Sequence, residues 1–128
     1  MASVTTSALT ELGGKFVLNR AVAAGNASLN ALSGGGTIYL IEIDNEANSS
    51  AMYLKIADGT SATPSNGATN GAGTPHYTFI APAYTKMCYS VPGGIALSTG
   101  LSYWVTSSTS VGTTTEPPKD VIVKMLCG

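Results

Sequence analysis

A change of pattern at Lys15 constrains the fold more than any other feature of this chain. Before Lys15 the sequence is small, polar and without periodicity, whereas after it short apolar runs alternate with clusters of Gly, Pro, Asn and Ser. Runs of this length, bounded by turn-forming residues, are typical of β-strands. The sequence therefore predicts an all-β fold, with strands at residues 15–19, 27–32, 37–44, 52–57, 76–81, 86–91, 101–107 and 121–127.

Alternation along these runs assigns their faces, because successive side chains of a strand point to opposite sides. In the run 52–57, Met52, Leu54 and Ile56 share one face, and Lys55 lies on the other with Tyr53 and Ala57. This pattern predicts a half-buried strand with one solvated face. Three later runs repeat the period, and their predicted inward residues are Met87, Tyr89, Val91, Leu101, Tyr103, Val105, Val121, Val123 and Met125.

The run 37–44 is apolar on both faces. Tyr39, Ile41 and Ile43 share one face by simple alternation, and Ile38 and Leu40 share the other. A strand with this pattern is expected to be covered on both sides.

About eight short alternating strands predict an antiparallel two-sheet sandwich, jelly-roll-like in form. The 128 residues have the length of one domain, which we assign to residues 15–128. Residues 1–14 are expected to form an extended N-terminal arm, with at most one helical turn at 7–12. The segments 58–75 and 107–119 have the small, polar composition of long loops.

Charged residues make up only 10% of the chain, against roughly 25% in an ordinary soluble domain. A surface this poor in charge suggests that partners cover much of it. The net charge is −1 and the six Lys and Arg residues are scattered, whereas binding to phosphates requires clustered positive charge. We therefore expect no nucleic-acid partner.

No run approaches the roughly 18 apolar residues that a membrane helix requires. The first eight residues lack the basic start and the apolar stretch of a secretory signal. We therefore expect no membrane partner and synthesis in a cytoplasm.

The sequence offers little for catalysis. His76 is the single histidine, and no GxSxG nucleophile motif occurs. Glycoside hydrolysis requires paired carboxylates, but of the clustered acids Glu42 and Asp44 share a strand face and Glu46 follows in a turn. We predict that the protein is not an enzyme, with no catalytic residue, no cofactor and no small-molecule substrate.

Two further patterns bear on a possible metal or redox site. Residues 44–49 place oxygen side chains at alternate positions, but they lack the glycine and the distal glutamate of a calcium loop. Side chains that bond their own backbone in a turn are the simpler interpretation. Cys88 and Cys127 match neither a zinc site nor a CxxC pair, so we expect buried or half-buried thiols in strands and no metal.

Exposed aromatic side chains often anchor protein interfaces, and they also stack on sugar rings. The face assignment turns Tyr53 and Trp104 outward and places Tyr84 in a turn, while Tyr77 is expected to point inward. For Trp104 we expect first a contact between subunits. Stacking on a sugar ring and packing without a binding role are the alternatives. The candidate interface residues are Leu9, Leu12, Ile38, Leu40, Tyr53, Tyr84 and Trp104.

Three motifs occur in a suggestive order: YLKI at 53–56, GIALSTGLSY at 94–103 and DVIV at 120–123. With the Thr-, Pro- and Gly-rich segment after the first motif, they resemble a family of small β-rich virion proteins of tailed bacteriophages. The resemblance runs from about Thr37 to the C-terminus. The chain departs from the family in the longer, Gly- and Asn-rich segment 57–75, and at Trp104, where the family more often carries a small residue.

The resemblance implies a compact β-sandwich that serves as a capsid decoration, or cement, subunit. The expected partner is then the major capsid protein, the expected location is the outer capsid surface of the virion, and the expected assembly is a homotrimer. Such a subunit binds between capsomers and stabilises the shell.

Two other classes stay open at this point. A host-glycan-binding domain of a head fibre, tail fibre or spike would share the sandwich, and we would expect it on a longer chain with a shaft. A polysaccharide depolymerase would need catalytic carboxylates that this sequence barely offers. Copy number in purified particles separates these classes, because decoration requires hundreds of copies.

Overall fold

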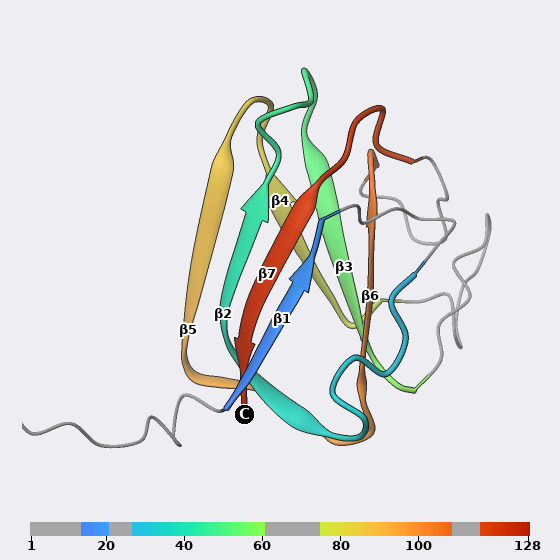
Figure 1. Cartoon of the computed structure of the whole chain (residues 1–128), viewed down its shortest axis with the longest axis vertical. Coiled ribbons are helices and arrows are strands. Elements are labelled where there is room, and N and C mark those ends of the chain that lie inside the picture. Colours follow the sequence, from blue (N-terminus) through green and yellow to red (C-terminus); the bar gives the residue numbers. More distant parts are fainter. Residues whose placement is uncertain (1–13, 21–26, 61–74, 109–115) are drawn as a thin grey trace, which may run out of the picture.

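The computed structural model describes residues 14–20, 27–60, 75–108 and 116–128, and within them the regular structure consists of strands only. The strands form a four-stranded sheet of order β1-β7-β2-β5 and a three-stranded sheet of order β4-β3-β6, which Figure 1 shows as two layers. Every strand pairing is antiparallel. The predicted all-β, two-sheet antiparallel sandwich is confirmed. The strands are β1 (Lys15–Asn19), β2 (Gly36–Asp44), β3 (Met52–Asp58), β4 (Tyr77–Ala81), β5 (Lys86–Leu97), β6 (Leu101–Thr106) and β7 (Ile122–Cys127).

The strand predicted at 27–32 is wrong. This segment makes only an isolated bridge, in which Ser28 and Tyr103 exchange backbone hydrogen bonds of 2.9 Å. Asn30 and Ser33 adopt left-handed backbone conformations, with φ of 49° and 55°, and these turn the chain away before a ladder can form. The segment nevertheless lies along the edge of β6. Counted with β6, it would give four strands in each sheet, as in a jelly roll, which stays a prediction.

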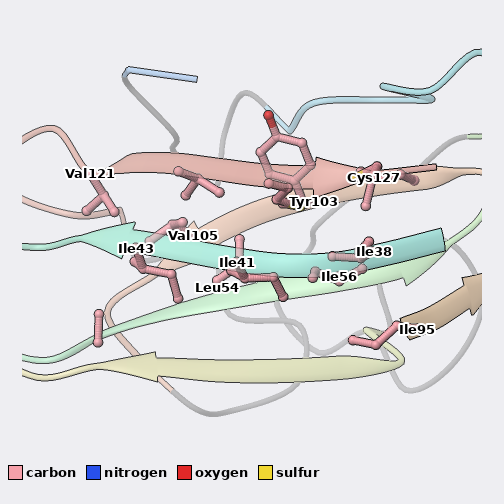
Figure 2. Close-up of a cluster of buried hydrophobic side chains, with 14 of the residues drawn as sticks. Ile38, Ile41, Ile43, Leu54, Ile56, Ile95, Tyr103, Val105, Val121 and Cys127 are labelled. Atoms are coloured by element: carbon pink, nitrogen blue, oxygen red, sulfur yellow. The ribbon is translucent and has the colours of Figure 1, made fainter. Parts of the chain in front are cut away.

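The core lies between the two sheets and contains the side chains that alternation predicts. Met52, Leu54 and Ile56 of β3 are fully buried against residues of the other sheet. Figure 2 shows Leu54 and Val105 of one sheet together with Ile41 and Val121 from the other layer. The predicted inward residues of β6 and β7 are also buried, and those of β5 are partly buried against the same core. The two-residue alternation of side chains along each strand therefore predicted most of the core residues.

A bulge in β2 overturns the face assignment of that strand. The register with both neighbouring strands shifts between Ile38 and Leu40, so one extra residue, Tyr39, interrupts the alternation. As a result Ile38, Ile41 and Ile43 all point into the core and are fully buried, while Leu40 lies half-buried on the outer face. By simple alternation the strand is apolar on both faces because the bulge changes which residues point inward, from even-numbered before it to odd-numbered after it.

The outer face of β3 is buried at Lys55 and Ala57 and half-buried at Tyr53, contrary to the solvated face predicted for it. Lys55 is 0% exposed and Trp104, its cross-strand partner on β6, is 1% exposed. Trp104 forms a small second cluster with Ala57 and with Ala27 of the segment beside β6. Burial lowers the pKa of Lys55, because it disfavours the charged ammonium.

Buried asparagines organise the turns at one end of the sandwich. The Asn45 amide donates to the carbonyl oxygens of Ser50, Ala81 and Pro82 at 2.9 to 3.1 Å. Asn48 donates to Asn45 Oδ1 at 2.9 Å. These bonds tie the β2–β3 turn to the β4–β5 turn. Within the turn itself, the Glu46 backbone N–H donates to Asp44 Oδ1 at 3.1 Å, so the predicted bond between a turn side chain and its own backbone is confirmed for Asp44.

Candidate interaction surface

The outer side of the four-stranded sheet carries the most exposed apolar side chain of that sheet. Phe16 is 62% exposed and Leu18 is 40% exposed. Phe16 pairs with Leu126 on β7, and Leu126 pairs with Leu40 on β2, so these side chains form a row across three strands. We call the surface made by Phe16, Leu18, Leu40, Glu42, Lys124 and Leu126 the β1–β7–β2 face.

A shallow hollow of about 120 Å³ lies on this face. The hollow is lined by the apolar side chains of Phe16, Leu40, Met125 and Leu126, and by Glu42 and Lys124. A hollow bordered by exposed apolar side chains is suited to receive a side chain of a protein partner.

The charges on this side of the sheet are paired. Lys124 lies 3.7 Å from Glu42, and Lys86 lies 3.9 Å from Asp44 and 3.6 Å from Glu46. The face therefore offers little net charge for steering a partner, and its contacts depend on shape and apolar area.

A second surface feature, polar rather than apolar, is a junction at the end of β3. The Asp58 carboxylate accepts hydrogen bonds from the backbone N–H groups of Ser98, Thr99 and Gly100 at 3.0, 2.8 and 3.2 Å, and from the Ser98 hydroxyl at 3.1 Å. The bond from Thr99 is the largest cause that lowers the pKa of Asp58 to about 2, and the bonds from Gly100 and Ser98 act in the same direction against desolvation. These hydrogen bonds hold the β5–β6 turn against the end of β3.

His76 belongs to the same junction. Its Nδ1 accepts a hydrogen bond of 2.9 Å from the backbone N–H of Asp58, and its own backbone N–H donates to Ile56. These bonds connect the start of β4 to the end of β3. The His76 imidazole therefore has a structural role, next to the Asp58 carboxylate that binds the β5–β6 turn.

The described residues contain no group of three or more His, Cys, Asp or Glu side chains arranged to hold a metal ion. They likewise include no helix of the length and hydropathy needed to cross a membrane.

The cysteines differ in environment. Both are free thiols in strands, but Cys127 is fully buried while Cys88 is exposed. The prediction of a buried or half-buried thiol is confirmed for Cys127 and wrong for Cys88. Burial raises the pKa of the Cys127 thiol to about 11.

The predicted interface residues do not gather in one place. Leu9 and Leu12 lie outside the described residues, as do residues 1–13 of the predicted arm. Ile38 and Trp104 are buried inside the subunit. Trp104 lies on the outer face of β6, as predicted, but that face is covered there, so the exposure expected for Trp104 is wrong. Leu40 and Tyr53 are half-buried on the outer faces of different sheets. Tyr84 is 67% exposed in the β4–β5 turn.

Phe16 and Leu18 are the surface residues that the sequence analysis did not single out. Their alternation with Lys15, Val17 and Asn19 was the available signal, because it places both on one face of a strand. Whether Phe16 and Leu18 lie on the inner or the outer face depends on how β1 packs against its neighbours. Tyr77 was expected to point inward but is 40% exposed at the start of edge strand β4.

No protein family, curated protein or solved structure matches this chain.

Proposed function

We propose that this chain is a capsid decoration (cement) subunit of a tailed bacteriophage, which binds the major capsid protein on the outer surface of the shell. The observation that carries the proposal is the β1–β7–β2 face, an exposed apolar surface with paired charges on a chain that is poor in charge. Such a face suits a subunit held by contact area, because many weak contacts add up on a repetitive lattice.

The contact between two motifs of the resemblance also supports the proposal. Asp58 directly follows the YLKI motif and its carboxylate binds the turn Ser98-Thr99-Gly100 of the second motif. The two motifs therefore form one structural unit, which gives a physical reason for their joint occurrence. The sandwich architecture is also common among virion and lectin domains, although a fold alone does not select a function.

In this proposal Leu40, Leu126 and the hollow beside Phe16 contact the shell. An anchor that fills or borders a desolvated pocket contributes more binding free energy than the rim around it. The paired charges make attachment only weakly dependent on salt. The homotrimer is part of the proposal through the resemblance.

The test uses particles that contain this protein. We expect hundreds of copies in each purified particle, and we expect particles stripped of it to release DNA at a lower temperature. Adding back the pure protein should restore the original release temperature. Few copies and unchanged release temperature would instead favour host attachment through a fibre or spike domain.

A matched pair of variants locates the docking face. Leu40→Lys places a charge on the β1–β7–β2 face, and Ile80→Lys places the same charge at an exposed site on the other sheet. We expect Leu40→Lys to rebind stripped particles at least about tenfold more weakly, while Ile80→Lys rebinds normally. Circular dichroism and melting of both variants control for folding. Equal rebinding by the two variants would remove the β1–β7–β2 face from the proposal.

A further inference from the structure

Tyr84 combines an unfavourable backbone conformation with an exposed side chain. Its φ is 55°, which lies in the left-handed region that bulky residues rarely adopt. Among the described residues, only Asn30 and Ser33 share a positive φ without being glycine, and both have small polar side chains. In this part of the chain Tyr84 is therefore the one bulky residue held in a conformation better suited to glycine.

The hydrogen bonds around Tyr84 fix this conformation. Its backbone N–H donates to the Asn48 carbonyl at 2.9 Å. Before it the Pro82 carbonyl accepts from the Asn45 side-chain amide at 3.1 Å, and after it the Thr85 carbonyl accepts from the Asn45 backbone N–H at 2.9 Å. Both asparagines are buried. The β4–β5 turn, which lies at the same end of the sandwich as the β2–β3 turn (Figure 1), is therefore held in this shape whichever side chain stands at position 84.

The Tyr84 side chain contributes little to the fold. It is 67% exposed, more than any other large hydrophobic side chain of the described residues, and Phe16 follows at 62%. A glycine at this position would relieve the backbone and remove little buried area. Conformational outliers of this kind cluster at functional sites, where the strain is kept for what the side chain does there.

The turn stands at one end of the outer side of the four-stranded sheet. Two residues after Tyr84, Lys86 pairs with Asp44 across β5 and β2, and its ammonium lies 3.9 Å from the Asp44 carboxylate. Asp44 shares the outer face of β2 with Leu40 and Glu42, because Ile41 and Ile43 between them point into the core. The exposed turn therefore continues the side of the molecule that carries the β1–β7–β2 face.

We propose that Tyr84 is a second anchor of the attachment surface and inserts its ring into a pocket of the major capsid protein. This inference rests on the capsid role proposed above. The same partner receives both contacts because the turn continues the side on which that attachment is proposed. A tyrosine on a fixed backbone suits this role, because it offers a large contact area at a small loss of conformational entropy. Its hydroxyl can bond a polar group of the pocket.

The test measures stability and rebinding to stripped particles for the same variants. Tyr84→Gly removes both the ring and the strain, so we expect it to melt no lower than the original chain and to rebind at least about tenfold more weakly. Tyr84→Phe keeps the ring and should rebind more tightly than Tyr84→Gly. Ser33→Gly is the matched control, because it makes the same backbone change at another exposed left-handed residue, and it should rebind normally.

The outcomes separate this inference from the capsid role. Normal rebinding by Tyr84→Gly, with weak rebinding by Leu40→Lys, would overturn the anchor and leave the capsid role in place. Melting of Tyr84→Gly well below the original chain would also overturn the anchor, because the side chain would then serve the fold. Particles that lack the protein, or normal rebinding by both variants, would overturn the proposed attachment and the anchor with it.

Discussion

The carboxylate of Asp58 at the end of β3 binds the backbone N–H of Thr99 in the β5–β6 turn at 2.8 Å. Neighbouring bonds from Ser98 and Gly100 make the same carboxylate an acceptor for the whole turn. Because β3 and β6 are adjacent strands, this contact determines where the chain reverses before β6 enters the sheet.

Replacing Asp58 by Asn should destabilise the fold. The amide keeps one acceptor oxygen but turns an N–H₂ group toward backbone donors, so at least one of them loses its partner. We expect a loss of about 1 kcal/mol in the free energy of unfolding at neutral pH, after allowing for solvent screening. Urea unfolding followed by the fluorescence of Trp104, the single tryptophan, measures it. An unchanged midpoint would contradict the role of the carboxylate.

The contribution of Asp58 should depend on pH. Its pKa is about 2 in the folded protein and about 3.9 in an unfolded chain, so the unfolded state binds the proton more readily. The stabilisation is therefore present above pH about 4 and is lost as the pH falls toward about 2. The difference in stability between the original chain and Asp58→Asn should shrink over this interval. A difference that stays constant with pH would contradict the assignment.

Gly100→Ala should destabilise the same turn for a steric reason. A Cβ at this position would lie 2.9 Å from the Gly59 carbonyl oxygen and 3.0 Å from Asn30 Oδ1, so neighbouring backbone would have to move. We expect a loss of about 1–3 kcal/mol. Gly14→Ala is the control, because a Cβ there meets nothing within 4 Å, and its effect should stay within about 0.5 kcal/mol. Equal denaturant midpoints for the two variants would contradict this packing.

Asn45→Ala should be among the more damaging substitutions of a polar residue. The Asn45 amide nitrogen serves three carbonyl oxygens and its Oδ1 accepts from Asn48, and both asparagines are buried. Removing it leaves buried polar groups without partners, for an expected loss of about 2–3 kcal/mol. Glu46→Ala, on the exposed side of the same turn, should change stability by less than about 0.5 kcal/mol. Thermal and chemical unfolding of the two variants check the contrast.

The thiols should react at different rates. Cys88 is exposed, whereas Cys127 is fully buried and has a pKa raised to about 11, so it stays protonated and inaccessible near neutral pH. A disulfide reagent should modify one thiol per chain under native conditions and a second only after unfolding. The variant Cys88→Ser should then show no rapid reaction, and rapid reaction in that variant would contradict the burial of Cys127.

The sequence predicted one residue of the β1–β7–β2 face as an interface residue. Leu40 was among the predicted interface residues, and it does lie on an outer face. Ile38 was assigned with it because strict alternation places residues two apart on one side. The bulge at Tyr39 breaks that rule, and a bulge depends on how the neighbouring strands pair, which a single strand's pattern does not reveal.

The sequence by itself determined the all-β class, the places of seven strands and most of the inward residues, because a period of two is a local property of each strand. The tertiary structure decided which outer faces are covered. Lys55 and its cross-strand partner Trp104 are both buried on the outer face of their sheet, and burial of an outer face depends on segments distant in sequence. It also decided that β1 is an edge strand, because strand order results from the packing of the whole chain. In the middle of the sheet Phe16 and Leu18 would have neighbouring strands on both sides, whereas at the edge only β7 flanks them, and their outer face is exposed.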